Sequence, residues 1–294
     1  MTNAFTIRGL KKQYKNFVLG PVDLELAPGT VLAYVGPNGS GKSTTMHCQT
    51  GLVRPDSGSI EIFGRENDLN KPEWKLDVGY VGDIHCFYEN WSGQKNLNFL
   101  SDFYPDWSHQ RAETLAQRFR LNLNEKAKNL STGDRAKLAI IAALAHWPRL
   151  LILDEPTAGL DPVVRTEVLD VFFEFMEDGE RAIFISTHIL SDISRLADEL
   201  AFLDNGRITR QTAKDDLTDK WRRITFQFNG NTLKVDAAVV ENHEGRDHQV
   251  ISTDHEKTLK QLGEIGAENI QQSRMSIDEI AVQILKDGHN VAAN

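Results

Sequence analysis

Cysteine is almost absent from this sequence. Cys48 and Cys86 are its only two cysteines, and two cysteines cannot form a disulfide framework, so we expect a reducing, cytoplasmic environment. A long apolar segment is also missing. The longest apolar run, 138–145, is far shorter than the ~20 residues of a membrane-spanning helix. No apolar block follows the basic residues near the N-terminus, so no signal peptide is expected. Any membrane role is therefore expected to come through a partner.

An excess of positive charge is the third absence. The formal net charge is −9, which argues against non-specific binding to nucleic acid. With 40% hydrophobic and 26% charged residues, the composition is that of a globular protein and not of a disordered chain. At 294 residues the chain is long enough for a sizeable core and for two folding units.

Residues 36–44 match the phosphate-binding pattern G-x-x-x-x-G-K-[ST]. The apolar run 31–35 predicts a strand before them, and a helix can begin after them. Glycines let backbone N–H groups turn toward one point, and a helix N-terminus adds partial positive charge there. A glycine-rich turn without a nucleotide is the weaker interpretation. The predicted ATP-binding residues are Gly36, Pro37, Asn38, Gly39, Ser40, Gly41, Lys42, Ser43 and Thr44, with Lys42 on the outer phosphates and Ser43 also a ligand of Mg²⁺.

Two further apolar runs end in polar residues. Residues 150–153 lead into Asp154 and Glu155, and residues 182–185 lead toward His188. We expect Asp154 to hold Mg²⁺ through its water shell and Glu155 to act as general base on an attacking water. His188 could hydrogen-bond the γ-phosphate, or it could be structural. Strands that alternate with helices and carry polar ends predict an open parallel α/β sheet with its site along one edge.

Aromatic residues are concentrated between residues 85 and 107. Two interpretations stay open, a socket for a helix of a partner protein and the core of a small helical subdomain. Ser92 and Ser108 are predicted N-caps of helices that run to about Tyr104 and Arg120. A third helix is predicted to follow the capping pair of Ser131 and Asp134 and to stop at 147–148. The aromatic residues are Phe87, Tyr88, Trp91, Phe99, Phe103, Tyr104 and Trp107.

The two ends of the chain have weaker patterns. Residues 5–7 and 22–26 alternate, which predicts two strands, and Tyr14 between them either stacks on adenine or caps a hairpin. Near the C-terminus, residues 224–228 alternate, Asn229–Gly230 predicts a hairpin that returns over 232–235, and 249–252 can add a strand. Ser276 to Glu279 caps a final amphipathic helix. Its apolar face would need cover, which suggests dimer contacts or regulation. His243, His248 and His255 lack metal-ligand spacing.

Together, these motifs resemble the ATP-binding subunit of an ABC transporter over about residues 4–211. The signature segment is 130–134, the second nucleotide motif 151–157, the loop at the dimer interface 158–161, and His188 the switch histidine. The resemblance implies an α/β fold, a P-loop NTPase cassette with a mostly parallel core sheet, an antiparallel β edge and a helical subdomain inserted at about 84–147. It predicts an ABC ATP-binding domain at 1–211 and a small C-terminal α+β domain at 212–294.

The resemblance also implies partners and cofactors. Two cassettes, expected to be identical, would close head-to-tail on two molecules of ATP with Mg²⁺ and hydrolyse them to ADP and phosphate. They would power a separate transmembrane permease from the cytoplasmic face of the cell membrane, without nucleic acid. Tyr14 would stack on adenine, and Asp161 would lie in the interface loop. The residues that would reach the ATP of the other chain are Ser131, Thr132, Gly133 and Asp134.

Two departures from the family pattern concern acidic residues. Asp83, a predicted metal ligand, stands where the family usually has Gln, and Asp134 stands where the signature usually has Gln. A carboxylate beside phosphate is unfavourable, so we expect that of Asp134 to fold back onto the Ser131 N–H. These departures and the Tyr-Pro-x-Trp segment at 104–107 resemble a branch of separately encoded bacterial exporter cassettes.

Two other functions stay open at this stage. One is a soluble ABC ATPase that acts on nucleic acid or ribosomes, although the acidic charge and the lack of a second cassette disfavour it. The other is a nucleotide-dependent regulatory module with weak hydrolysis, which Asp83 and Asp134 suggest.

Overall fold

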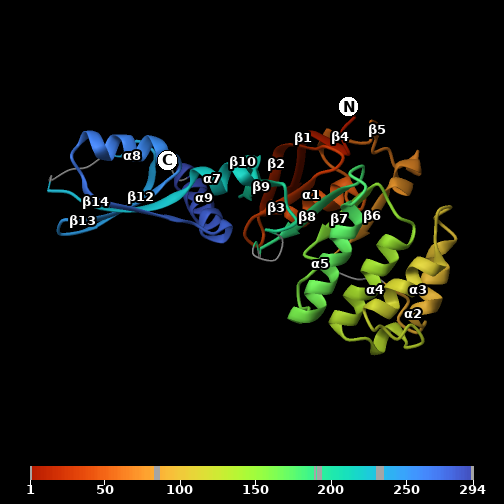
Figure 1. The fold of residues 1–294 in the computed structure, drawn as a ribbon. Coiled ribbons are helices and arrows are strands. Elements are labelled where there is room, and N and C mark those ends of the chain that lie inside the picture. Colours follow the sequence, from red (N-terminus) through yellow and green to blue (C-terminus); the bar gives the residue numbers. More distant parts are fainter. Residues whose placement is uncertain (1, 83–86, 189, 191–193, 230–234, 293–294) are drawn as a thin grey trace. The chain divides into compact units, whose positions relative to one another are not determined.

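The structure is a computed structural model of the chain, and it describes all residues except 1, 83–86, 189, 191–193, 230–234 and 293–294 (Figure 1). The chain divides into two compact units. The first comprises Met1–His188 and Arg195–Arg210, and the second comprises Ile189–Ser194 and Gln211–Asn294. In the part of the chain that the structure describes, no helix is long and apolar enough to cross a membrane.

A six-stranded sheet forms the centre of the first unit, in the order β10-β9-β3-β8-β7-β6. The neighbours β9-β3-β8-β7-β6 pair in parallel. β3 and β7 are buried along their whole length, as expected for strands covered on both faces. The strands are β3 (Val31–Val35), β6 (Val78–Val81), β7 (Leu150–Asp154), β8 (Ala182–Thr187), β9 (Glu199–Asp204) and β10 (Arg207–Ala213). The predicted parallel sheet is confirmed.

The N-terminal strands belong to a second sheet, in the order β2-β1-β4-β5. They are β1 (Phe5–Tyr14), β2 (Phe17–Leu26), β4 (Ser57–Ile62) and β5 (Arg65–Glu66). The predicted antiparallel part of the fold is thus present, as a sheet whose strands pair with one another.

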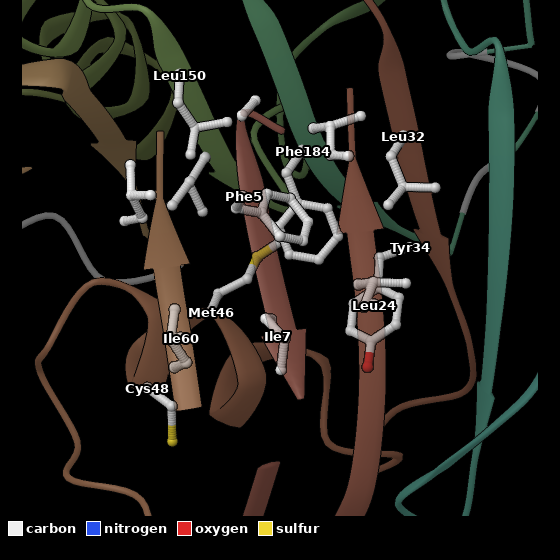
Figure 2. Close-up of a cluster of buried hydrophobic side chains, with 14 of the residues drawn as sticks. Phe5, Ile7, Leu24, Leu32, Tyr34, Met46, Cys48, Ile60, Leu150 and Phe184 are labelled. Atoms are coloured by element: carbon white, nitrogen blue, oxygen red, sulfur yellow. The ribbon is translucent and has the colours of Figure 1, made fainter. Parts of the chain in front are cut away.

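The two sheets and α1 (Lys42–Gln49) share one apolar core (Figure 2). Alternate residues of the antiparallel strands, such as Phe5, point into it. The Phe5 ring lies 5.0 Å from that of Phe184 on β8, and Tyr34 on β3 lies 5.2 Å from Phe184. Met46 joins them from α1. The loop between β3 and α1 is thereby fixed at both of its ends.

Three helices follow the edge strand β6 and lie together in Figure 1. They are α2 (Gly93–Ser101), α3 (His109–Arg118) and α4 (Thr132–Ala145), with the short 3₁₀ segments η1 (Pro72–Asp77) before them and η2 (Ala127–Asn129) between α3 and α4. The predicted caps are confirmed, because Ser92 accepts from Lys95 N at 3.2 Å and Ser108 from Arg111 N at 3.1 Å. The first two helices are shorter than predicted. α5 (Pro162–Met176) follows β7.

The aromatic segment divides into an exposed part and an inner part. We call Tyr88, Trp91, Phe99 and Phe103 the aromatic ladder, since ring centroids of successive members lie 4.2, 5.7 and 5.2 Å apart. Tyr88 is 53% and Phe103 is 59% exposed. Tyr104, in contrast, stacks on the buried His146 with centroids 4.0 Å apart. Tyr88 and Phe103 thus lie on the surface, while Tyr104 packs on a buried residue. Docking of a partner's helix on the exposed rings stays a prediction.

The second unit contains a four-stranded sheet, in the order β12-β13-β11-β14. Its elements are α7 (Lys214–Lys220), β11 (Arg222–Gln227), β12 (Ala238–Glu244), β13 (Asp247–Ser252), α8 (His255–Glu264), β14 (Glu268–Arg274) and α9 (Ile277–Ala292). The strands predicted at 224–228 and 249–252 correspond to β11 and β13. The sheet neighbours of β11 are β13 and β14, and the hairpin predicted at Asn229–Gly230, with its return over 232–235, falls mostly on residues that the structure does not describe. Residues 230–234 lie outside the described residues.

The terminal helix α9 begins with the predicted capping pair. Ser276 N donates to Glu279 Oε2 at 2.8 Å, and Glu279 N donates to Ser276 Oγ at 3.2 Å. Its apolar side chains Ile277, Ile280 and Ile284 are buried by the chain itself. These side chains therefore have their cover within the chain, and a role of this segment in dimer contacts or regulation stays a prediction.

Candidate active site

The phosphate loop leaves the end of β3 and enters α1 through two constrained glycines. A Cβ on Gly36 would lie 2.3 Å from Leu203 O, so no side chain fits there. Gly41, the N-cap of α1, has φ 112°, a left-handed conformation that other residues rarely adopt. Neither a side-chain cap nor an acidic residue occupies the start of α1. Its first N–H groups are therefore available for an anion.

Lys42 lies over this loop and is only 6% exposed. Its Nζ donates to Gly36 O at 2.8 Å and to Pro37 O at 3.3 Å, and it lies 3.8 Å from Glu155 Oε1. Burial lowers the pKa of the amine, against the opposing effect of the Glu155 and Asp154 carboxylates. The ammonium group is thus held next to the carboxylate predicted to be the base.

Asp154 ends β7 and is 1% exposed. Its Oδ1 accepts a hydrogen bond from Ser186 Oγ at 2.5 Å. Its Oδ2 is buried and has no hydrogen-bond partner among the described residues. A buried carboxylate oxygen normally has a partner, so this oxygen and the nearby Ser43 hydroxyl suit a Mg²⁺ ion with its water shell. Asp83, the other predicted metal ligand, lies outside the described residues.

Glu155 joins the lysine and the histidine. Its backbone is left-handed, with φ 52°, and its N–H donates to Ser186 Oγ at 3.0 Å. Its Oε2 lies 2.8 Å from His188 Nδ1, while its Oε1 faces Lys42. The side chain of His188 is half exposed, so its other ring nitrogen is accessible. Lys42, Asp154, Glu155 and His188, which three sequence motifs predicted, therefore lie at one edge of the sheet.

A cavity of about 570 Å³ opens in front of this group, which is within the range of small-molecule sites. It is lined by Asn16, Phe17, Asn38, Gly39, Gly41, Lys42, Ser43, Thr44 and Glu155. Asn16 and Phe17 were not predicted. Tyr14 is not among the lining residues and pairs with Phe17 across the β1–β2 turn. That position agrees with the hairpin interpretation, and stacking on adenine stays a prediction. No motif marks these two residues, and their place between two predicted strands is the signal that could have pointed to them.

The signature segment 130–134 starts helix α4. Ser131 Oγ accepts from Asp134 N at 3.1 Å, as a capping pair should, and donates to Asp134 Oδ2 at 2.8 Å. The carboxylate therefore folds back onto the Ser131 hydroxyl, and not onto its N–H as predicted. Lys137 Nζ donates to Asp134 Oδ1 at 3.0 Å. Partial burial alone would raise the pKa of Asp134, but the hydrogen bonds from Lys137 and Ser131 outweigh it, so the pKa is lowered.

The predicted interface loop lies against this signature turn within the same chain. A Cβ on Gly133 would be 3.6 Å from Leu160 Cδ2, and one on Gly159 would be 3.9 Å from Thr132 Cγ2. Asp161 caps α5, since its Oδ1 accepts from Val163 N at 3.0 Å and from Val164 N at 3.1 Å. The loop is thus anchored at the start of α5 and lies against the start of α4.

Comparison with known proteins decides the family. A family model described as "ABC transporter" matches residues 19–158. The chain is 37% identical to the lantibiotic transport ATP-binding protein SrtF of Streptococcus pyogenes over 215 residues, which are 71% of this chain and 90% of that protein. This chain belongs to the ATP-binding subunits of ABC transporters. The ABC subunit is also 29% identical to the bacitracin transport ATP-binding protein BcrA of Bacillus licheniformis, over 90% of this chain and 88% of that protein.

Solved structures agree with this assignment. An ATP-binding subunit of an ABC transporter superposes with a TM-score of 0.67 at 30% identity, covering 74% of this chain and 92% of the other. A dimeric cassette bound to ADP and Pi superposes with a TM-score of 0.65 at 24% identity, covering 71% and 98%, and supports the fold. The predicted fold class and family are confirmed. This ABC subunit is an ATPase that serves a transporter.

Proposed function

We propose that this chain is the ATPase subunit of an exporter and that two identical copies of it work as a dimer. ATP with Mg²⁺ would lie between the phosphate loop of one copy and the Ser131 end of α4 in the other. The observation that carries the proposal is that Lys42 and Glu155 line a cavity of about 570 Å³ beside the phosphate loop, with Glu155 contacting both Lys42 and His188. A dimeric cassette among the solved relatives supports the pairing.

Each side chain would have one task in hydrolysis. Lys42 would replace its hydrogen bonds to Gly36 O and Pro37 O by hydrogen bonds to the outer phosphates of ATP. Ser43 and Asp154 would hold Mg²⁺, which neutralises the charge that develops on the phosphates. Glu155 would take the proton of the attacking water, and His188, at 2.8 Å, would orient its carboxylate. The γ-phosphoryl group then passes to water and ADP leaves.

The Glu155→Gln variant tests this assignment. The amide keeps the shape of the side chain but cannot accept the proton, so we expect ATP binding to be retained and kcat to fall at least ~10²-fold. The variant should also accumulate as an ATP-bound dimer in sedimentation experiments. Glu177→Gln, at the exposed C-cap of α5, is the matched control. Turnover that stays at the wild-type rate in Glu155→Gln would refute the role of Glu155.

The aromatic ladder is the surface that we propose for docking the membrane subunit. Tyr88 before helix α2, Phe99 on it and Phe103 after it are exposed, and Lys95 Nζ lies 4.3 Å from the centre of the Trp91 ring. Exposed aromatic side chains with a cation at their rim are typical of interface centres. Phe103→Ser should abolish co-purification with the membrane subunit and leave the ATPase activity of the isolated chain unchanged. If Phe103→Ser co-purified at the wild-type level, the docking proposal would be refuted, and the proposed ATPase mechanism would be unaffected.

Export as the direction of transport rests on the relatives. They include proteins named for bacitracin transport, lantibiotic transport and daunorubicin resistance. Resistance to a drug is most directly explained by its removal from the cell. ATP-dependent uptake of cargo into inside-out vesicles is the measurement that decides the direction, and uptake only in right-side-out vesicles would contradict export.

A further inference from the structure

We propose that Ser186 is a positioning residue of the active site, which fixes both the metal-binding carboxylate of Asp154 and the turn at Glu155. The serine is the penultimate residue of strand β8 and is completely buried. Nothing in the sequence pattern gave it a role, since it merely precedes the switch histidine by two residues. The proposal rests on the roles proposed above for Asp154 and Glu155.

The register of the parallel sheet places Ser186 beside Asp154. One hydroxyl then makes two hydrogen bonds. Ser186 Oγ donates to Asp154 Oδ1 at 2.5 Å and accepts from the backbone N–H of Glu155 at 3.0 Å. A hydroxyl has one proton and two lone pairs, so the first bond fixes the direction of its proton and the second uses its acceptor capacity.

The two bonds have different consequences. The bond to Oδ1 holds the Asp154 carboxylate in one orientation and leaves Oδ2 buried without a protein partner. That oxygen is then the one available to the metal. Partners that orient ligating carboxylates in this way commonly contribute 10- to 100-fold to metal affinity or activity.

The bond to the Glu155 N–H stabilises an unusual backbone. Glu155 has φ 52°, a left-handed conformation that is unfavourable for a residue with a Cβ. This conformation carries the Glu155 side chain to Lys42 and His188, at 3.8 and 2.8 Å. Ser186 O also accepts from the same N–H, at 3.3 Å, so both polar atoms of one residue hold the turn.

The test is Mn²⁺ binding to the full chain in the presence of ADP, followed by electron paramagnetic resonance. For Ser186→Ala we expect the Mn²⁺ affinity to fall about tenfold. In steady-state assays kcat should fall by a similar factor, and the KM for ATP should change less than about twofold. Ser186→Cys keeps the volume but is a weak donor, and it should behave like Ser186→Ala, which separates loss of the hydroxyl from creation of a cavity.

Ser252→Ala is the matched control. Ser252 is also fully buried, and its Oγ lies 2.7 Å from Thr258 Oγ1 within the second unit. This variant should bind Mn²⁺ as the wild type does. Wild-type Mn²⁺ affinity in both Ser186 variants would overturn the inference and leave the proposed function intact. Absence of Mn²⁺ binding in the wild type would instead refute the proposed metal site.

Discussion

Helices α1 and α4 would both direct their N-termini at the same triphosphate, yet they begin in different ways. α1 starts at a glycine N-cap, without a side-chain cap and without an acidic residue in its first turn. α4 starts at Ser131, whose hydroxyl is already hydrogen-bonded, and it has Asp134 in its first turn. An anion near a helix N-terminus is favourable. In α4 the Asp134 carboxylate of the chain itself is this anion.

This difference indicates a division of labour between the two helices. The start of α1 is open to a ligand in the single chain, and Lys42 adds a positive charge to it. The start of α4 already has hydrogen bonds within the chain and a carboxylate in its first turn, so we expect a single chain to bind phosphate weakly there. We infer that the α1 end determines nucleotide affinity, while the α4 end contributes once a second copy brings a nucleotide to it.

The two helices also have different C-terminal ends, and we expect only the end of α4 to become less stable at low pH. α1 ends at Thr50, whose hydroxyl donates to Met46 O at 2.9 Å. α4 ends at His146, which is 4% exposed, stacks on Tyr104 and contacts Val78 O on β6 at 3.3 Å. Burial lowers the pKa of His146 from 6.5 to about 4, although the hydrogen bond to Val78 O opposes the shift.

The largest effect expected from this comparison is a loss of stability in acid. The unfolded chain binds the proton of His146 near pH 6.5 and the folded chain only near pH 4. Stability is therefore lost as the pH falls through this window, by about 2 kcal/mol at pH 5 relative to pH 7.5. In His146→Gln the free energy of unfolding, measured by guanidinium denaturation at both pH values, should lack this part of the decrease.

The exposed His109 at the start of α3 provides the control for that experiment. His109→Gln removes a histidine from the same group of helices without touching the contact between α4 and β6. If His146→Gln lost as much stability between pH 7.5 and pH 5 as His109→Gln, the acid-sensitive contact would lie elsewhere, and the two helix ends would not differ in the way proposed.

Features encoded within a few consecutive residues were predictable from the sequence. The phosphate loop, the capping pair of Ser131 and Asp134 and the cap of α9 depend on spacings of three to eight residues, and the structure contains each of them. The contacts of Ser186 depend on the register between β7 and β8, which no local pattern contains. The order of the strands around β11 was likewise not predictable, because strand order is decided by the packing of the whole sheet.

The smallest effect expected concerns the acidic start of α4. Asp134→Asn removes one negative charge from the proposed phosphate contact, while its amide oxygen can still accept from the Ser131 hydroxyl. In the Glu155→Gln background, we expect ATP-dependent dimerisation to tighten about fivefold, equivalent to the ~1 kcal/mol of one partly exposed charge pair. Sedimentation at low and high salt should show the gain shrinking as salt screens the charge.

Asp254→Asn makes the same change at the cap of α8 in the second unit, where Asp254 accepts from Lys257 N at 3.2 Å, and it should leave dimerisation unchanged. A weaker dimer in Asp134→Asn would reverse the argument. It would mean that Asp134 assists ATP by holding Lys137 at the start of α4, with their 3.0 Å contact as the device that brings a positive charge to the phosphates. The two helix starts would then work alike, each through a lysine.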